Sequence, residues 1–117
     1  MITQPIGIGE NRSRIIYESI KKIPKGKVTT YGDIARLCGL LNCSRIVGYA
    51  LRSLPEDSGI PWHRVVNSEG RISFPLNSSD YQMQRKLLEA EGIVFSKNKI
   101  DLIKYDWLKY KKGKYGW

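Results

Sequence analysis

The chain has 117 residues, enough for one domain that buries a core of its own without disulfides or metals. Twenty lysines and arginines against eleven aspartates and glutamates give a formal net charge of +9 at pH 7. That excess favours a polyanionic partner, nucleic acid above all. A lysine-rich surface that only keeps the protein in solution explains the composition equally well.

The sequence excludes several classes of protein. It has no run of about 20 apolar residues, so no membrane-spanning helix and no membrane partner are expected. Residues 1–9 lack the charged and apolar segments of an export signal. Cys38, Cys43 and the single histidine, His63, are too few for a structural zinc site or a disulfide framework. We therefore expect a monomeric intracellular protein without metal or cofactor, cytoplasmic and nucleoid-associated, or nuclear in a eukaryote.

The first predicted element is a helix that follows a flexible lead over residues 1–10. The helix begins near Asn11, a fair N-cap, and its isoleucines recur at helical spacing as far as Ile23. Pro24 and Gly26 then end it. The folded domain is therefore expected to start at residue 11.

Two short helices are predicted next. Thr30 and Asp33 have the spacing of a capping box, which opens a helix that Gly39 ends. After a tight connection over residues 40–44, the apolar periodicity of residues 45–54 predicts a second helix. Two short helices joined by a few residues that include a glycine indicate a helix-turn-helix.

The solvent face of the second helix is unusual, because it carries Arg45, Gly48, Tyr49 and Arg52. A glycine inside a helix costs about 1 kcal/mol relative to alanine, so the close approach of another backbone would account for Gly48. That backbone is either the sugar-phosphate chain of DNA or another part of the same domain.

A stiff turn is predicted at Pro61, because proline restricts both its own backbone and that of the preceding residue. Trp62, His63 and Arg64 follow it directly. These three side chains could line a pocket. The alternative, which residue types alone favour, is that Trp62 is an aromatic plug over the core.

The second half of the chain contains further predicted elements. Residues 63–67 and 71–74 flank a turn and predict a β-hairpin. A helix opens at Ser79 and ends at Gly92. Its inward side is expected to carry Met83, Leu87, Leu88 and Ala90. Residues 101–107 are ambiguous between strand and loop.

The tail over residues 108–117 interleaves four lysines with aromatic side chains. Such a pattern could hold a nucleic-acid backbone and stack on bases. A disordered tail that improves solubility is the commoner outcome for such a composition.

Three spaced motifs resemble the C-terminal domain of O6-alkylguanine-DNA alkyltransferases. The motifs are Gly26–Ala35, Ser44–Leu51 and Ile60–Val65. The enzymes read Pro-Cys-His-Arg in the last motif, and that cysteine takes the alkyl group from guanine, whereas here Trp62 stands in its place. This exchange resembles the alkyltransferase-like proteins, which bind alkylated bases without repairing them.

The resemblance runs over residues 13–107 and implies a fold. We expect a mainly α protein with a small β-hairpin. It would form a single winged-helix-like domain over residues 11–107 that contains the helix-turn-helix.

The resemblance also implies roles for individual residues. Tyr31 would turn the phosphate beside the target nucleotide, and Arg45 would enter the duplex in place of the extruded base. The helix that carries Arg45 would lie in the minor groove. Glu91 would orient His63, whereas Arg64 would hold structure. The implied lesion pocket consists of Tyr31, Trp62, His63, Val65, Pro75, Leu76 and Glu91. The implied DNA-binding surface consists of Thr30, Tyr31, Arg45, Gly48, Tyr49, Ala50 and Arg52.

Two departures from the enzyme pattern affect this pocket. Leu54 lies where the enzymes have an asparagine in the turn before the proline. In the loop where the enzymes place polar groups over the base, this chain has Pro75, Leu76 and Asn77. A loop without a bulky lid residue would admit larger adducts.

The exchange at position 62 decides the expected chemistry. Alkyl transfer requires an activated thiolate, and indole offers no comparable nucleophile. The implied function is a non-enzymatic sensor that flips O6-alkylguanine out of double-stranded DNA and marks it for nucleotide excision repair proteins. Two alternatives stay open: an alkyltransferase that uses another cysteine, and a helix-turn-helix regulator without lesion preference.

Overall fold

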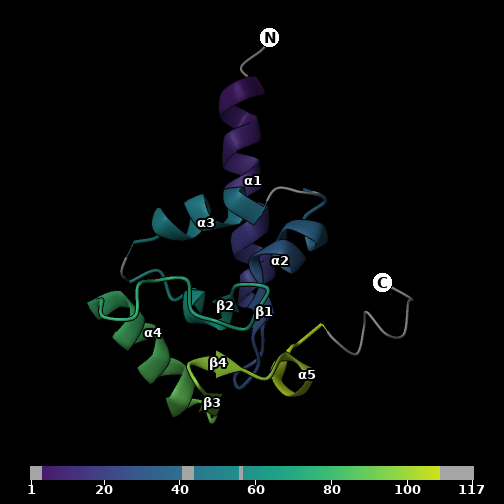
Figure 1. Cartoon of the computed structure of the whole chain (residues 1–117). Coiled ribbons are helices and arrows are strands. Elements are labelled where there is room, and N and C mark those ends of the chain that lie inside the picture. Colours follow the sequence, from purple (N-terminus) through teal and green to yellow (C-terminus); the bar gives the residue numbers. More distant parts are fainter. Residues whose placement is uncertain (1–3, 41–43, 56, 109–117) are drawn as a thin grey trace.

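The computed structural model of the chain describes residues 4–40, 44–55 and 57–108. The helices are α1 (Gln4–Lys21), α2 (Tyr31–Leu37), α3 (Ser44–Arg52), α4 (Ser79–Ala90) and α5 (Leu102–Tyr105), with a 3-10 turn, η1, at Trp62–Arg64. The strands are β1 (Thr29–Thr30), β2 (Val65–Val66), β3 (Phe95–Ser96) and β4 (Lys99–Ile100). In Figure 1, α1 to α3 form one half, and α4, the β3–β4 pair and α5 form the other. The predicted mainly α fold of a single small domain is confirmed.

The helical half is built around α1. Ile20 is fully buried, and Ile34 of α2 and Val47 of α3 pack in the same cluster. Burying each such side chain contributes about 1.5–3 kcal/mol. The hydroxyl of Tyr17 also donates a hydrogen bond of 2.7 Å to the carbonyl of Ala50. Together these contacts hold α2 and α3 against α1.

The helix-turn-helix forms where the sequence predicts it. The side-chain oxygen of Thr30 accepts a hydrogen bond from the N–H of Asp33, so Thr30 caps α2. Gly39 follows the end of α2 with a φ of 75°, a conformation that glycine adopts without strain. The observed bounds of α3 differ from the predicted ones by no more than the usual uncertainty of helix ends.

The predicted start of the first helix is wrong. α1 begins at Gln4 rather than at Asn11, so residues 4–10 are helical and not an irregular lead. Pro5 lies in the first turn, where its missing N–H breaks no helical hydrogen bond. The glycines of this segment disfavour a helix locally, but propagation from the packed part of α1 adds one bond per residue.

α4 has the predicted bounds but not the predicted buried face. The side chain of Ser78 caps it, and Gly92 follows its end with a φ of 94°. Met83 is 56% exposed, and Ala90 is exposed as well. Leu88 is fully buried as predicted, but it shares the buried stripe with Tyr81 and Gln84, which were not predicted. Because this stripe contains a polar residue, apolar periodicity alone pointed to the wrong side of the helix.

The predicted hairpin over residues 63–67 and 71–74 is wrong. β2 pairs in parallel with β1, with Thr29 opposite Val65, and residues 71–74 are irregular. Val65 and Val66 are both fully buried. A strand covered on both faces is typical of parallel pairing. The pairing joins the start of α2 to the end of η1.

The antiparallel hairpin lies later in the chain, where β3 pairs with β4. Lys97 and Asn98 connect the strands with positive φ angles of 53° and 63°, as a two-residue turn requires. Residues 101–107 contain α5 instead of a strand or loop. The carboxylate of Asp101 caps it by accepting from the N–H of Ile103 at 2.9 Å. Four residues are too few for helical periodicity to show.

No helix in the described part of the chain is long and apolar enough to cross a membrane. The predicted basic aromatic tail lies, from residue 109 on, outside the residues that the structure describes.

Candidate nucleic-acid interface

Trp62 is presented by a tight turn rather than packed as a plug. The N–H of Arg64 donates to the carbonyl of Pro61 at 3.1 Å, and the φ of Pro61 is −77°. The indole lies edge-on to two rings, with centroid distances of 6.0 Å to His63 and 6.4 Å to Phe74. Trp62 stays partly accessible. The pocket interpretation of this stretch is therefore the better one.

A cavity of about 600 Å³ opens between α3 and this turn. Its walls come from the start of α2, the exposed face of α3, η1, residues 73–74 and α4. Residues of both implied sets line it, namely Tyr31, Arg45, Gly48, Tyr49, Arg52 and Trp62. The implied lesion pocket and DNA-binding surface therefore meet in one hollow.

The exposed face of α3 is open to a partner outside the domain. A Cβ added at Gly48 would meet no described atom from outside its own helix backbone within 4 Å. Packing against another described part of the domain therefore does not explain this glycine, which favours the approach of a partner from outside. Arg45 and Arg52 are exposed, and neither forms an ion pair with a residue that the structure describes.

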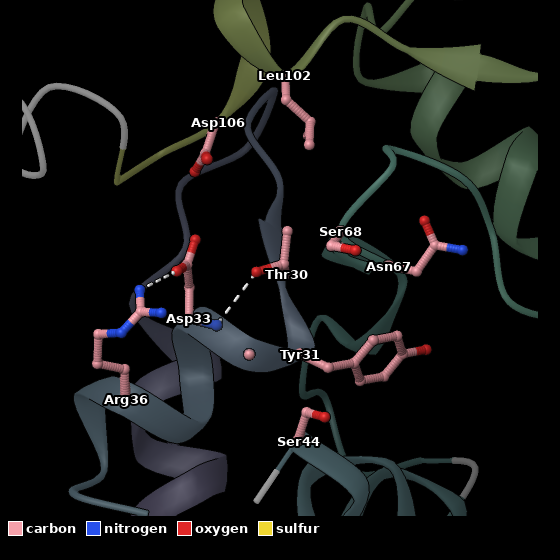
Figure 2. A pocket seen from close by; sticks show the side chains of 10 residues that line it. Thr30, Tyr31, Asp33, Arg36, Ser44, Asn67, Ser68, Leu102 and Asp106 are labelled. Atoms are coloured by element: carbon pink, nitrogen blue, oxygen red, sulfur yellow. Dashed lines mark hydrogen bonds and ion pairs between the residues drawn. The ribbon is translucent and has the colours of Figure 1, made fainter. Parts of the chain in front are cut away.

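A second hollow of about 990 Å³ also has Tyr31 in its lining, at the start of α2 (Figure 2). Thr30, the cap of α2, lines it. The carboxylate of Asp33 accepts an ion-pair hydrogen bond of 2.7 Å from Arg36, and Asp106 lies across the hollow. Arg36 balances the charge of Asp33, and Asp106 leaves the described lining of this hollow with one excess negative charge, whereas the described lining of the cavity beside Trp62 has two arginines and no carboxylate. The cavity beside Trp62 is therefore the better candidate for nucleic acid.

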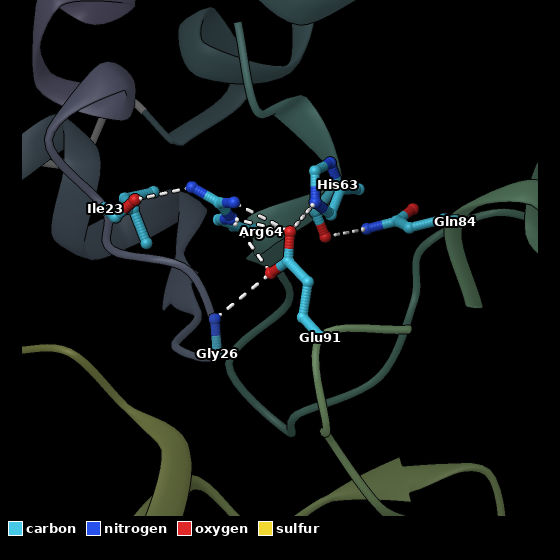
Figure 3. A network of polar contacts seen from close by, with 6 residues as sticks. All are labelled: Ile23, Gly26, His63, Arg64, Gln84 and Glu91. Atoms are coloured by element: carbon cyan, nitrogen blue, oxygen red, sulfur yellow. Dashed lines mark hydrogen bonds and ion pairs between the residues drawn. The ribbon is translucent and has the colours of Figure 1, made fainter. Parts of the chain in front are cut away.

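Glu91, which follows α4, binds two other segments of the chain at once (Figure 3). Its Oε2 lies 2.8 Å from Nε2 of His63. Arg64 donates to both oxygens, with Nε at 3.0 and 3.2 Å and Nη2 at 2.7 Å. The N–H of Gly26 donates to Oε1 at 3.2 Å, and Nη1 of Arg64 donates to the carbonyl of Ile23 at 2.8 Å. The end of α4, the loop after α1 and the Trp62 turn are thereby joined.

The charge of Glu91 is stabilised within this network. Burial by itself would raise the pKa of this carboxyl group. Hydrogen bonds from Arg64, His63 and Gly26 outweigh burial and lower the pKa to about 2. Glu91 is therefore ionised at neutral pH. It contacts His63 as the resemblance implied, and Arg64 is occupied by structural bonds.

Seven of the implied site residues do not line the cavity: Thr30 lines the second hollow, His63 and Glu91 belong to the polar network, and Ala50, Val65, Pro75 and Leu76 lie elsewhere. Val65 and Ala50 are buried in the helical core, which corrects their assignment to the pocket and the DNA surface. Val65 is covered in β2, and Ala50 lies two residues after Gly48, on the opposite side of the helix. Pro75 and Leu76 are exposed but lie outside the cavity lining.

Five residues of the cavity lining were missing from the implied sets, namely Ser44, Leu51, Ser73, Phe74 and Gln84. Phe74 was assigned to a hairpin strand, and only the packing against Trp62 shows its place. Gln84 did leave a signal, because it interrupts the apolar stripe formed by Tyr81 and Leu88 on α4. A polar residue on a buried stripe requires hydrogen-bond partners, and such partners often lie at a functional site.

The fold and the cavity agree with the sequence profile that matches the chain. The profile is described as 6-O-methylguanine DNA methyltransferase, DNA binding domain, and it matches residues 11–93. The chain belongs to this family. It shares the family's helix-turn-helix domain and carries Trp62 in the motif where the resemblance leads us to expect cysteine.

Two relatives and one solved structure place the chain more closely within the 6-O-methylguanine DNA methyltransferase family. The chain is 52% identical over 93 residues to the DNA base-flipping protein of Vibrio parahaemolyticus, covering 79% of this chain and 91% of that protein. It is 40% identical over 97 residues to Alkyltransferase-like protein 1 of Schizosaccharomyces pombe, covering 79% and 90%. A crystal structure of S. pombe Atl1 in complex with damaged DNA containing O6-carboxymethylguanine superposes with a TM-score of 0.78 at 38% identity, covering 84% of this chain and 95% of that one. The resemblance to alkyltransferase-like proteins is confirmed.

Proposed function

We propose that this chain is a non-enzymatic sensor of DNA damage. It binds O6-alkylguanine in double-stranded DNA, as a monomer, and marks the lesion for nucleotide excision repair proteins. The observation that carries the proposal is the continuity between the exposed face of α3 and the cavity beside Trp62. A helix that docks on DNA through this face brings the mouth of the cavity to the nucleotide that it displaces.

The cavity suits a base that has left the stack. Its volume of about 600 Å³ lies within the range of roughly 300–1,000 Å³ typical of small-ligand sites. Trp62 and Phe74 offer aromatic surfaces against which a purine can pack. Flipping costs a few kcal/mol, and the cost is lower for a base whose pairing alkylation has already weakened. The lower cost of flipping a weakly paired base therefore contributes to the selectivity for lesions.

The open face of α3 supplies the contacts that flipping requires. Arg45 stands at the start of α3 and has the reach, the charge and the planar donors to fill the void left by the base. The empty space above Gly48 allows a sugar-phosphate backbone to approach the helix closely in the minor groove. Tyr31 and Arg52 flank the same hollow and can position the phosphates.

The cavity contains no thiol among the residues that the structure describes. Cys38 lies 3.5 Å from the hydroxyl of Ser19 and packs against the helical core, outside the cavity lining. Cys43 lies outside the described residues. The indole of Trp62 is not a nucleophile for alkyl transfer. These observations favour binding without chemistry over an alkyltransferase that uses another cysteine.

The relatives support the choice of DNA as partner. One is named a DNA base-flipping protein, and the Atl1 structure contains damaged DNA. A protein that binds a lesion without removing it needs a second system to complete repair. Excision of the nucleotide by other proteins is the class of reaction that meets this need.

The proposal is tested with one duplex prepared with guanine and with O6-methylguanine at the same position. The chain should bind the modified duplex more tightly in fluorescence anisotropy, and intact-mass measurement after incubation should show an unmodified protein. Equal affinity for both duplexes would favour a helix-turn-helix regulator. A gain of one methyl mass per chain would show an alkyltransferase.

A further inference from the structure

The buried glutamine of α4 is fixed in orientation by the main chain of the Trp62 turn. Gln84 is 2% exposed, and its Nε2 donates to the carbonyls of His63 and Val65, both at 3.0 Å. Carbonyl groups only accept, so the amide nitrogen must face them, and the amide oxygen must face away. Figure 3 shows the nitrogen turned to the carbonyl of His63 and the oxygen turned away from it.

The orientation leaves an acceptor at the cavity. Gln84 lines the cavity together with Trp62 and Phe74. Its hydrogen bonds within the described parts of the chain all come from the nitrogen. An acceptor in the wall of the cavity favours a ligand that brings a donor to it, because a polar group that loses its water when the ligand enters needs a new hydrogen-bond partner.

O6-alkylguanine has few groups that can satisfy this acceptor. Alkylation at O6 holds the ring in the form without a proton on N1, so O6, N1, N3 and N7 are all acceptors. The exocyclic amine on C2 is the donor that remains on the base. An acceptor in the cavity wall can therefore accept a hydrogen bond from the exocyclic amine of this base.

We infer that Gln84 is a specificity-determining residue, whose Oε1 accepts a hydrogen bond from the exocyclic amine of the flipped base while its Nε2 holds the Trp62 turn. The inference rests on the proposed function and deepens it. It gives the site a preference among alkylated bases. O6-methylhypoxanthine, which differs from O6-methylguanine by loss of the amine, binds less tightly.

The test uses three duplexes that differ at one position, with guanine, O6-methylguanine or O6-methylhypoxanthine. Their affinities are measured for the wild type, for Gln84→Lys and for Gln82→Lys. Gln84→Lys keeps donors for the two carbonyls and removes the acceptor. Gln82→Lys is the matched control, because it adds the same charge on an exposed face of the same helix.

The wild type and Gln82→Lys should bind O6-methylguanine about tenfold more tightly than O6-methylhypoxanthine, as expected for one buried hydrogen bond. Gln84→Lys should reduce this ratio to near one. Where the buried lysine prevents folding, Gln84→Met removes both donor and acceptor at similar volume and should give the same ratio.

The outcomes separate the two proposals. Wild-type protein that binds both alkylated bases equally, and both more tightly than guanine, overturns the role of Gln84 and leaves the proposed function standing. An unchanged tenfold ratio in the position-84 variants also overturns it, because another group then recognises the amine. Wild-type protein that prefers neither alkylated base over guanine overturns the proposed function itself.

Discussion

The two sides of the Trp62 turn use arginine in opposite ways. On the α3 side, Arg45 and Arg52 are exposed and have no ion-pair partner in the described part of the chain. On the α4 side, the side chain of Arg64 is 16% exposed and donates to Glu91 and to the carbonyl of Ile23. Net charge therefore predicts a nucleic-acid surface only when the cations that form ion pairs within the protein are left out of the count.

The comparison also separates rigidity from access. The α4 side is a closed network of short hydrogen bonds, which fixes the position of Trp62. The α3 side is open above Gly48, and its two arginines have no ion-pair partner among the residues that the structure describes. A binding site that must accept an extruded base needs both, because a fixed wall provides selectivity and an open face allows entry.

The largest expected effect comes from neutralising the closed side. Glu91→Gln should lower the free energy of unfolding at pH 7 by about 3 kcal/mol, the amount linked to a pKa lowered from 4.5 to about 2. Because the folded-state pKa is depressed, this stabilisation is fully present above pH 4.5 and is lost as the pH falls toward 2. In urea unfolding, the difference in free energy of unfolding between the wild type and Glu91→Gln should shrink as the pH falls from 4.5 toward 2. A difference that does not depend on pH would show that Glu91 does not stabilise the fold through its charge.

The next effect concerns the open side. Arg45→Ala should reduce the preference for O6-methylguanine over guanine by about tenfold, or about 1.4 kcal/mol, because the void in the duplex is left unfilled. The free energy of unfolding should change by less than about 0.5 kcal/mol, as for an exposed residue. Arg45→Lys should be intermediate. 2-Aminopurine beside the lesion should brighten with the wild type and stay dim with Arg45→Ala; equal brightening would make Arg45 an ordinary phosphate contact.

Gly48→Ala should separate folding from binding. No atom from another described segment meets the added Cβ, so the free protein should gain up to about 1 kcal/mol from the better helix propensity of alanine. The same methyl group intrudes where the DNA backbone approaches, so affinity for modified and unmodified duplexes should fall several-fold. Urea unfolding and fluorescence anisotropy on the same preparation test the expected gain in stability and the expected loss of DNA affinity. Unchanged DNA affinity would remove α3 from the interface.

The smallest effect is expected where the two sides join, in β1. The hydroxyl of Thr29 is buried and has no hydrogen-bond partner among the described residues. Thr29→Val keeps the shape and removes this polar group, so the free energy of unfolding should stay within about 0.5 kcal/mol of the wild type or rise by up to about 1 kcal/mol. Lesion preference should not change. A destabilised variant in urea unfolding would show that the hydroxyl has a partner in solution.

The parts that sequence predicted depend on local signals. The cap at Thr30, the glycine after α2 and the glycine after α4 each act within a single turn of chain, and each lies where it was predicted. The cavity residues Tyr31, Arg45 and Trp62 came from the resemblance, and the structure gathers them.

The parts that sequence missed depend on pairing between distant segments. Val65 and Val66 read equally well as a hairpin strand, and only β1 from the other half decides their pairing. Gln84 is buried because the turn at His63 presents carbonyls to it. The pattern on α4 shows Gln84 as a polar interruption of a stripe, but it does not identify the distant carbonyls that bind its side chain.

The Glu91 network also sets an order of assembly. Its hydrogen bonds connect Gly26 with Glu91, 65 residues apart, and Arg64 with Ile23, 41 residues apart. Loops of this length close late in folding, because chain entropy is lost before the contact forms, whereas the contacts between α2 and α3 are local. We expect α2 and α3, which carry the proposed DNA surface, to be in place while Trp62 is still loosely held. In pulsed hydrogen exchange during refolding, the amides of α2 and α3 should become protected before the amide of Gly26. The proposed DNA-binding surface would then form before the pocket that distinguishes alkylated guanine from guanine.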